Sequence, residues 1–117
     1  PWGVILDPGL VAKTAVNAAI GVDDFGAATN FGGYQVAQIL AGNGTATIKT
    51  QHASTNSGGS FVDLAGATTG VVSCSTPSAL INPTARLVTV NRFLRWQVVF
   101  GTATTVTFML SFVRARS

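Results

Sequence analysis

Charged side chains are scarce in this chain of 117 residues: Asp, Glu, Lys and Arg together make up 9% of it, whereas about a quarter is usual in globular domains. Apolar residues reach the usual level, 47%. Low hydrophobicity with high charge marks a disordered chain, so this composition excludes disorder. A surface with few charges is either covered by a neighbour or solvated by hydroxyl and amide groups. We favour the first alternative, a subunit of an assembly, over a monomeric threonine-rich domain.

Cysteine and histidine occur once each, as Cys74 and His52. One cysteine excludes an intramolecular disulfide and a cysteine metal cluster, and nothing in the sequence links it to the histidine as a catalytic pair. Asp23 and Asp24 are the only neighbouring carboxylates, and no calcium-loop pattern surrounds them. Glycine-rich phosphate loops and a serine nucleophile motif are also missing. We therefore expect no enzymatic activity, no cofactor and no metal site.

Apolar runs that approach the roughly 18 residues of a membrane span are missing, as is a signal-peptide pattern. We expect no membrane contact, and synthesis in a cytoplasm, where a lone cysteine stays reduced. Five of the seven basic residues are arginines in the last third of the chain: Arg86, Arg92, Arg95, Arg114 and Arg116. They are spread over predicted strands and a tail instead of forming a dense patch. We therefore expect protein contacts and no nucleic-acid binding.

The clearest pattern is an alternation of apolar and other residues in two segments, 93–100 and 105–114. A period of two predicts strands, because helix geometry cannot place such positions on one side. Residues 101–104 are predicted to close the two strands into a hairpin. All eight large side chains would then lie on one side of a sheet, which needs a second layer to cover it. These side chains are Leu94, Trp96, Val98, Phe100, Val106, Phe108, Leu110 and Phe112.

Shorter segments complete the predicted fold. Residues 34–41 and 45–52 are predicted strands, joined into a hairpin by an Asn-Gly turn. Residues 76–83 are predicted to be a crossing loop, and further strands are predicted at 13–20, 61–64, 68–75 and 86–90. The chain is therefore predicted to be all-β: one antiparallel β-sandwich over residues 1–117, with jelly-roll or immunoglobulin-like topology. An extended N-terminal arm over residues 1–12, anchored by Trp2 and Leu6, is the alternative to a strand there.

Two regions of the chain resemble a family of tailed-bacteriophage virion proteins. In that family, an Asn-Arg-aromatic-aliphatic-Arg strand is followed by a short turn and a strand that ends in arginine. The corresponding residues here are NRFLRWQVVF at 91–100, Gly101, TTVTF at 104–108 and LSFVR at 110–114. Upstream, residues 26–33, 46–53 and 61–64 resemble the hairpin, Ile-Gln-His-Ser and Trp-x-Asp-Leu segments of the same family. This chain departs from the pattern in having Lys49-Thr50 before Gln51, and Phe61 where tryptophan is common.

The resemblance covers about residues 22–114 and implies a β-sandwich on the outside of a virion. The function we prefer is a capsid decoration, or cement, protein that binds the major capsid protein or another virion protein and stabilises the head. The alternative is a tail or fibre module that serves virion assembly or binds a host-surface glycan. Phe25, Phe31 and Tyr34 beside Asp23-Asp24 are the only candidate cluster for a glycan.

Such subunits form closed oligomers by default, and by analogy we expect a homo-oligomer, with a trimer favoured. The protein would be made in the host cytoplasm and located on the capsid surface. The residues predicted to contact partners are Trp2, Leu6, Arg114 and Arg116. Trp2 is chosen because tryptophan often anchors an interface, and the arginines because arginine is enriched there.

Overall fold

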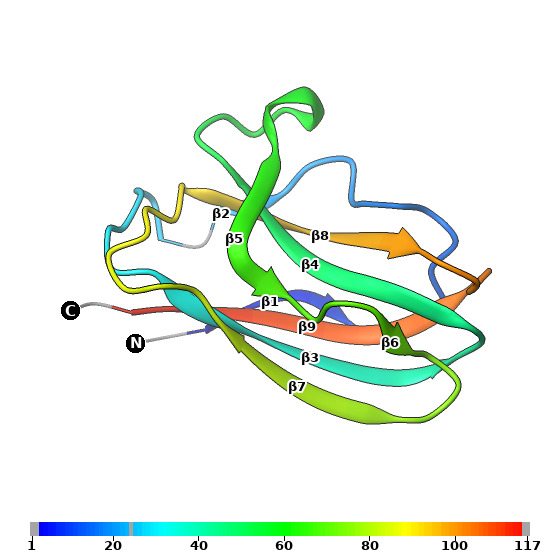
Figure 1. Ribbon diagram of the computed structural model, residues 1–117. Coiled ribbons are helices and arrows are strands. Elements are labelled where there is room, and N and C mark those ends of the chain that lie inside the picture. Colours follow the sequence, from blue (N-terminus) through cyan, green and yellow to red (C-terminus); the bar gives the residue numbers. More distant parts are fainter. Residues whose placement is uncertain (1–2, 24, 116–117) are drawn as a thin grey trace.

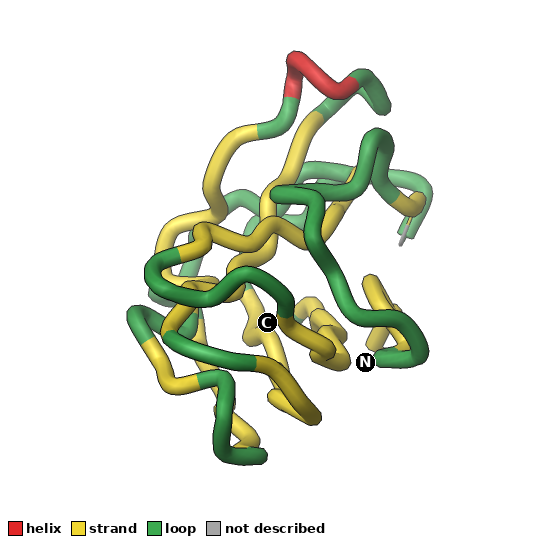
Figure 2. Tube along the Cα trace, turned by 90° about the vertical axis from the view of Figure 1, so that its right-hand side faces the viewer, coloured by secondary structure: helices red, strands yellow, loops and turns green. Residues whose placement is uncertain are grey.

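The computed structural model describes residues 3–23 and 25–115 and contains two antiparallel sheets packed face to face (Figures 1 and 2). The first sheet contains, in spatial order, β1 (Gly3–Pro8), β9 (Val106–Arg114), β3 (Gly33–Gly42) and β7 (Ser78–Pro83). The second contains β2 (Val22–Asp23), β8 (Phe93–Phe100), β4 (Thr45–Ala53) and β5 (Val62–Thr68), while β6 (Val72–Ser73) also pairs with β4. A short 3-10 helix, η1 (Gly58–Ser60), precedes β5. The predicted all-β sandwich is confirmed.

The order of the strands identifies the sandwich as a jelly roll. Every link between successive strands of the described chain crosses from one sheet to the other, except those that join β4, β5 and β6. The orders β1-β9-β3-β7 and β2-β8-β4-β5 are those that two Greek keys generate in a double-sheet jelly roll. An immunoglobulin-like sandwich keeps its first two strands in one sheet, whereas β1 and β2 lie in different sheets here.

Both predicted hairpins are wrong, because the two strands of each pair lie in different sheets. β3 and β4 are joined through a turn at Asn43, and β8 and β9 through residues 101–105, yet neither pair is adjacent in a sheet. Crossing between the sheets lets both strands direct their apolar faces toward each other across the core. The two corners bind each other: the Thr104 amide donates to Asn43 Oδ1 (2.9 Å) and the Thr45 amide donates to the Thr102 hydroxyl (2.9 Å).

The core lies between the two sheets and contains the apolar residues that the alternation predicts. Trp96 of β8 and Phe108 of β9 meet edge to face across the sandwich, with ring centroids 5.7 Å apart. Burial of a large apolar side chain stabilises a fold by about 1.5–3 kcal/mol, so this set is a main source of stability. Cys74 is fully buried. The predicted residues that are buried are Leu94, Trp96, Val98, Val106, Phe108, Leu110 and Phe112, and Phe100 is partly buried.

Three segments between the clear strands differ from the predictions. Residues 76–83, predicted as a loop, contain β7. Pro77 and Pro83 were the reason for predicting a loop, because proline has no N–H to donate to a sheet. Proline is tolerated on an edge strand, at positions whose N–H would have no ladder partner. Residues 86–90 form a loop and not a strand, and of 68–75 only the end of β5 and the two residues of β6 are extended.

The N-terminal region is bound to both sheets. Within residues 1–12, predicted as a strand or an arm, β1 pairs with β9 at the edge of the first sheet, and Trp2 lies outside the described residues. Residues 13–20, predicted as a strand, are irregular and run beside β8, bridged to it between Asn17 and Gln97. This segment therefore closes one open side of the sandwich.

Candidate interaction surfaces

Arg114, predicted to contact a partner, has its guanidinium inside the protein. Its relative exposure is 4%, and Nη1 donates to the Val90 carbonyl (2.8 Å) and the Thr29 hydroxyl (3.1 Å). Nη2 donates to the carbonyls of Asn91 (2.6 Å) and Arg92 (3.1 Å). Arg114 thus ties two loops to the end of β9. The signal was present in the sequence, because Arg114 continues the alternation of the buried positions 106–112.

The other predicted contact residues divide into two groups. Leu6 is half-buried and packs against both clusters of the core, so most of its side chain serves the fold. Trp2 and Arg116 lie outside the described residues. Their described neighbours, Gly3 and Ala115, lie at the same end of the sandwich, at the start of β1 and the end of β9 (Figure 1). An interaction role for these four residues stays a prediction.

The contacts of Arg114 join segments that are far apart in the sequence. Asn91 and Arg92 open the quoted strand, and Arg114 closes the next one and binds the carbonyls of both. His52 of the upstream segment joins them, because its Nδ1 accepts a hydrogen bond from the Asn91 amide (3.0 Å). Burial, together with the charge of Arg114, lowers the pKa of His52. The residues that carry the resemblance therefore hold the framework together.

Two loops and the last described residue gather at one end of the sandwich, near the start of β1 in Figure 1. We call residues 25–33, 84–92 and Ala115 the loop end. The loops are joined by two backbone hydrogen bonds between Thr29 and Val90, of 3.0 and 2.8 Å. Two hollows of about 280 and 320 Å³ open there, and Phe31 and Ala115 line both of them.

Large apolar side chains are exposed around the two hollows. Tyr34 and Leu87 also line the first hollow, and Phe25 the second. The exposed fractions are 53% for Phe25, 41% for Phe31, 39% for Tyr34 and 68% for Leu87, which are high for residues of this size. The structure therefore brings together the three aromatic residues that the sequence singled out, and adds a leucine that sequence reasoning missed.

Leu87 has a backbone conformation that leucine rarely adopts. Its φ is +63°, in the left-handed region that costs a residue with a Cβ atom roughly 1–2 kcal/mol. Burial does not offset this cost, because the side chain is largely exposed. Strain of this kind is commonly found at functional sites, where the surrounding structure enforces it. The loop thus holds an apolar side chain outward at an energetic cost.

Two arginines contribute charge to the loop end. Arg86 is exposed and lines the first hollow. Arg92 donates to Asp23 Oδ2 (2.6 Å), and both side chains of this ion pair are exposed. The hydrogen bonds from Arg92 and from the Gly26 amide lower the pKa of Asp23. Asp23, expected beside the aromatic residues, is therefore already paired, and Asp24 lies outside the described residues.

The outer face of the first sheet has no charged side chain. Its four strands, all within the described chain, contain only two charged residues, Asp7 and Arg114, and both are buried. We call the outward residues of these strands the neutral face. Three of its rows run across the sheet in the order β1, β9, β3, β7: Gly3-Val113-Tyr34-Pro83, Ile5-Ser111-Val36-Ile81 and Pro8-Met109-Gln38-Ala79.

The β1 edge of this sheet is protected against pairing with a further strand. The register shifts between Ile5 and Asp7, which marks a bulge, and Pro8 follows. Asp7 points inward, where its Oδ1 binds Lys13 Nζ at 2.8 Å, and Lys13 lies 5.5 Å from the centroid of the Trp96 ring. Bulges, prolines and inward-pointing charges are devices by which natural sheets block edge-to-edge association.

The β7 edge is protected by two prolines. The Thr84 amide donates to the Gly33 carbonyl (2.8 Å), so alternate positions of the ladder, 78, 80 and 82, also bond to β3. The backbone groups of Pro77, Ala79, Ile81 and Pro83 consequently point away from the sheet. Two of these four residues have no N–H to offer, so only a very short edge remains for strand addition.

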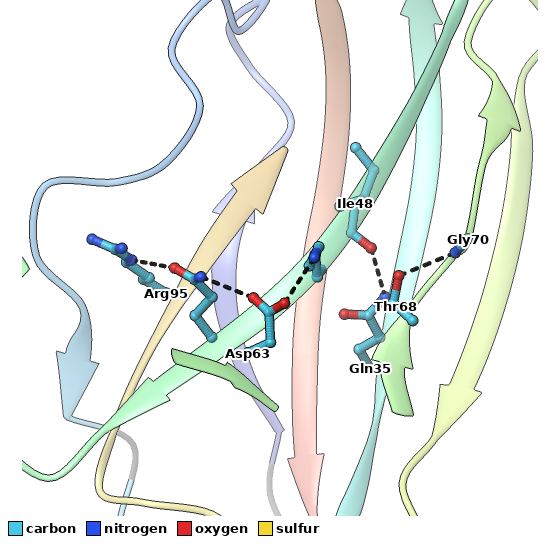
Figure 3. A network of polar contacts seen from close by, with 8 residues as sticks. Gln35, Ile48, Asp63, Thr68, Gly70 and Arg95 are labelled. Carbon is cyan, nitrogen blue, oxygen red and sulfur yellow. Dashed lines mark hydrogen bonds and ion pairs between the residues drawn. The ribbon is translucent and has the colours of Figure 1, made fainter. Parts of the chain in front are cut away.

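The outer face of the second sheet differs, because it has charged side chains that bind one another (Figure 3). Arg95 Nε donates to Gln51 Oε1 (2.8 Å), and Gln51 Nε2 donates to Asp63 Oδ1 (2.9 Å). Lys49 Nζ lies 2.8 Å from Asp63 Oδ2, and the Arg95 guanidinium lies over the Phe61 ring at 4.5 Å. The hydrogen bonds from Lys49 and Gln51 lower the pKa of Asp63.

The polar groups in the interior are also bound to one another. Gln35 is fully buried; its Oε1 accepts from the Thr50 hydroxyl (2.8 Å), and its Nε2 donates to the Ile48 carbonyl (3.2 Å) and Asn82 Oδ1 (2.9 Å). Cys74 lies beside the start of β4 and His52 near its end, roughly 20 Å away at the rise of a strand. The two side chains are thus too far apart to form a catalytic pair.

In the described residues, no group of three or more His, Cys, Asp or Glu side chains is placed to hold a metal ion. The same part of the chain has no helix of the length and apolarity that crossing a membrane requires. No protein-family model, curated protein or solved structure matches the chain. The surfaces described above therefore carry the functional argument.

Proposed function

We propose that this chain is a non-enzymatic virion structural protein: a capsid decoration protein that binds the outside of a phage head through its loop end. The observation that carries the proposal is the strained, exposed Leu87 beside Phe31 and two hollows. Exposed apolar surface of this kind is typical of protein contacts. The resemblance of residues 22–114 to phage virion proteins and the rigid jelly-roll body support the same assignment.

Binding to heads tests the proposal directly. Purified protein is mixed with decoration-free heads of the phage that encodes it, the heads are pelleted, and the bound copies are counted. We expect saturation at a fixed number of copies per head and a higher melting temperature of the heads. Absence of binding to any preparation of such heads would refute the proposal.

Leu87→Gly is the sharpest variant, because glycine adopts the positive φ without strain while the side chain is lost. Folding stability should change little, whereas affinity for heads should fall at least tenfold. Val71→Ser is the matched control, since Val71 is 77% exposed and lies between β5 and β6, outside the loop end. Equal affinities of both variants would exclude the loop end as the docking surface. Trp2→Ala is also expected to weaken binding without unfolding the protein.

A tail or fibre module that binds a host-surface glycan is the second candidate. It is favoured by one observation: Phe25, Phe31 and Tyr34 line two neighbouring hollows. Aromatic faces are suitable for packing against the apolar faces of sugars. Adsorption to host cells or to their purified polysaccharide, lost in Phe31→Ser and retained in Val71→Ser, would support this candidate. Saturable binding to heads without adsorption would exclude it.

A further inference from the structure

We infer that two copies of the chain pack together through the neutral face, sheet against sheet, about a two-fold axis. The inference goes beyond the proposed attachment to heads, which uses the loop end. The two surfaces adjoin at Tyr34 and are otherwise separate. Self-association and head binding can therefore be measured and disrupted independently.

Charge is the first argument for a second copy as the occupant. The chain has a net charge of +3, so two copies repel each other wherever charged surfaces meet. The loop end has the exposed Arg86 and the Arg92–Asp23 ion pair. The outer side of the second sheet has the Lys49–Asp63 ion pair, with Arg95 buried beside it. A two-fold axis places the same patch on both sides of the interface. The neutral face is the sheet face on which this arrangement brings no like charges together.

The apolar character of the neutral face is the second argument. Ile5 on β1 is 57% exposed and Ile81 on β7 is 67% exposed, at the two margins of the central row. Val36 lies between them in the same row and is half-buried. Two uncharged polar residues interrupt the apolar ones: Ser111 lies between Ile5 and Val36, and Gln38 lies in the next row. Scattered exposed apolar residues are normal, but an uncharged and largely apolar face across a whole sheet is uncommon on a soluble monomer.

The area of the face sets the expected strength of association. Three rows across four strands, at about 4.8 Å between strands and about 6.7 Å between rows, occupy about 400 Å² of flat sheet. That value is comparable to the largest apolar patches of monomers, about 300–600 Å². It is less than the roughly 800 Å² per partner of a standard interface. We therefore expect a reversible dimer whose population rises with concentration in the micromolar range.

Two copies can associate through this sheet by pairing edge strands or by stacking faces, and the sheet edges disfavour edge pairing. Strand addition would need a free edge, and both edges of the first sheet are blunted, by the bulge with Asp7 and Pro8 on β1 and by Pro77 and Pro83 on β7. Sheets that stack face to face lie about 10 Å apart, with interdigitated side chains. The partly exposed side chains of the neutral face suit such stacking.

Sedimentation velocity over a concentration range from about 1 μM to about 500 μM tests the inference. We expect the weight-average mass to rise toward twice that of the chain. Ile81→Lys should raise the dissociation constant at least tenfold, because it places a like charge on each side of the interface. Val99→Lys is the matched control: Val99 is also β-branched, 47% exposed and on the outer face of a strand, but in the second sheet.

Salt provides a readout that does not depend on folding of a variant. Contacts without charges should be retained or strengthened when ionic strength rises, because screening reduces the repulsion between two positive chains. Ile5→Lys serves as a second disruptive variant if Ile81→Lys does not fold. A monomer at all concentrations, a trimer, dissociation by added salt, or equal effects of Ile81→Lys and Val99→Lys would each overturn the inference.

The experiment also separates this inference from the proposed function. Leu87→Gly should still form the dimer but bind heads more weakly. Ile81→Lys should be monomeric, while each chain retains the loop end that binds heads. Normal self-association without any head binding would leave the inference standing and refute the decoration role. Head binding by a strictly monomeric protein would refute the dimer and leave the decoration role standing.

Discussion

Replacing Arg114 by alanine removes a guanidinium that donates four hydrogen bonds beneath the loop end. The bond to the Val90 carbonyl is buried and charge-assisted; its loss leaves that oxygen with the Thr29 amide as donor and costs about 1.5–3 kcal/mol, the range for a hydrogen bond to a charged group. The other three acceptors are partly buried, so water replaces the lost donors and each bond contributes about 0.5–1 kcal/mol. Relief of the buried charge offsets part of the loss. We expect the free energy of unfolding to fall by about 2–4 kcal/mol.

Urea unfolding followed by far-ultraviolet circular dichroism measures this change. Arg92→Ala is the control, because its ion pair with Asp23 is exposed and screened by solvent, so its loss should change the free energy of unfolding far less. Arg114→Lys should lie between Arg114→Ala and the wild type, since an ammonium group cannot reach all four acceptors at once. A loss below about 1 kcal/mol in Arg114→Ala, combined with weaker binding to a partner, would refute the structural role and support the interaction role predicted from sequence.

Three further changes have defined outcomes. Gln35→Leu should lower the free energy of unfolding by about 1–3 kcal/mol in urea, because Thr50 and its other partners lose their hydrogen bonds, and adding Thr50→Val should recover part of the loss. The pKa of His52 is lowered in the folded protein, so the unfolded chain binds the proton at a higher pH than the folded one. The free energy of unfolding should therefore be constant above about pH 6.5 and decrease below it, by at most about 1.4 kcal/mol per pH unit. Thermal melts of wild type and His52→Gln at several pH values check this, and equal slopes would contradict it. Burial raises the pKa of the Cys74 thiol, so a disulfide reagent should modify it only on unfolding, and rapid labelling of the native protein would contradict its burial.

The alternation of residues predicted which side chains face the core, but not which strands are neighbours. In β8 and β9, seven of the eight predicted apolar positions are buried. Periodicity states which residues share a face of one strand and nothing about the sheet to which that strand belongs. Short turns rich in glycine, asparagine and threonine are suitable for hairpins and for corners between sheets alike. The hairpin predictions failed for this reason.

The interaction surfaces were predictable only in part. Phe25, Phe31 and Tyr34 were identified as a cluster from sequence, but Leu87 joins them through the pairing of Thr29 with Val90, which no local pattern indicates. The neutral face depends on the order β1-β9-β3-β7, because only that order places three uncharged rows side by side. Long-range pairing of strands therefore creates both surfaces, and it is the property that a single sequence specifies least directly.

The position of β1 has a consequence for how the protein is made. In the first sheet β1 pairs only with β9, so residues 3–8 have no sheet partner until residues 106–114 have been synthesised. Ribosomes add roughly 5–20 residues per second, so the first strand waits on the order of ten seconds. The apolar strand β3 also lacks its central neighbour during this time. Folding of this sheet is therefore completed only after translation of β9.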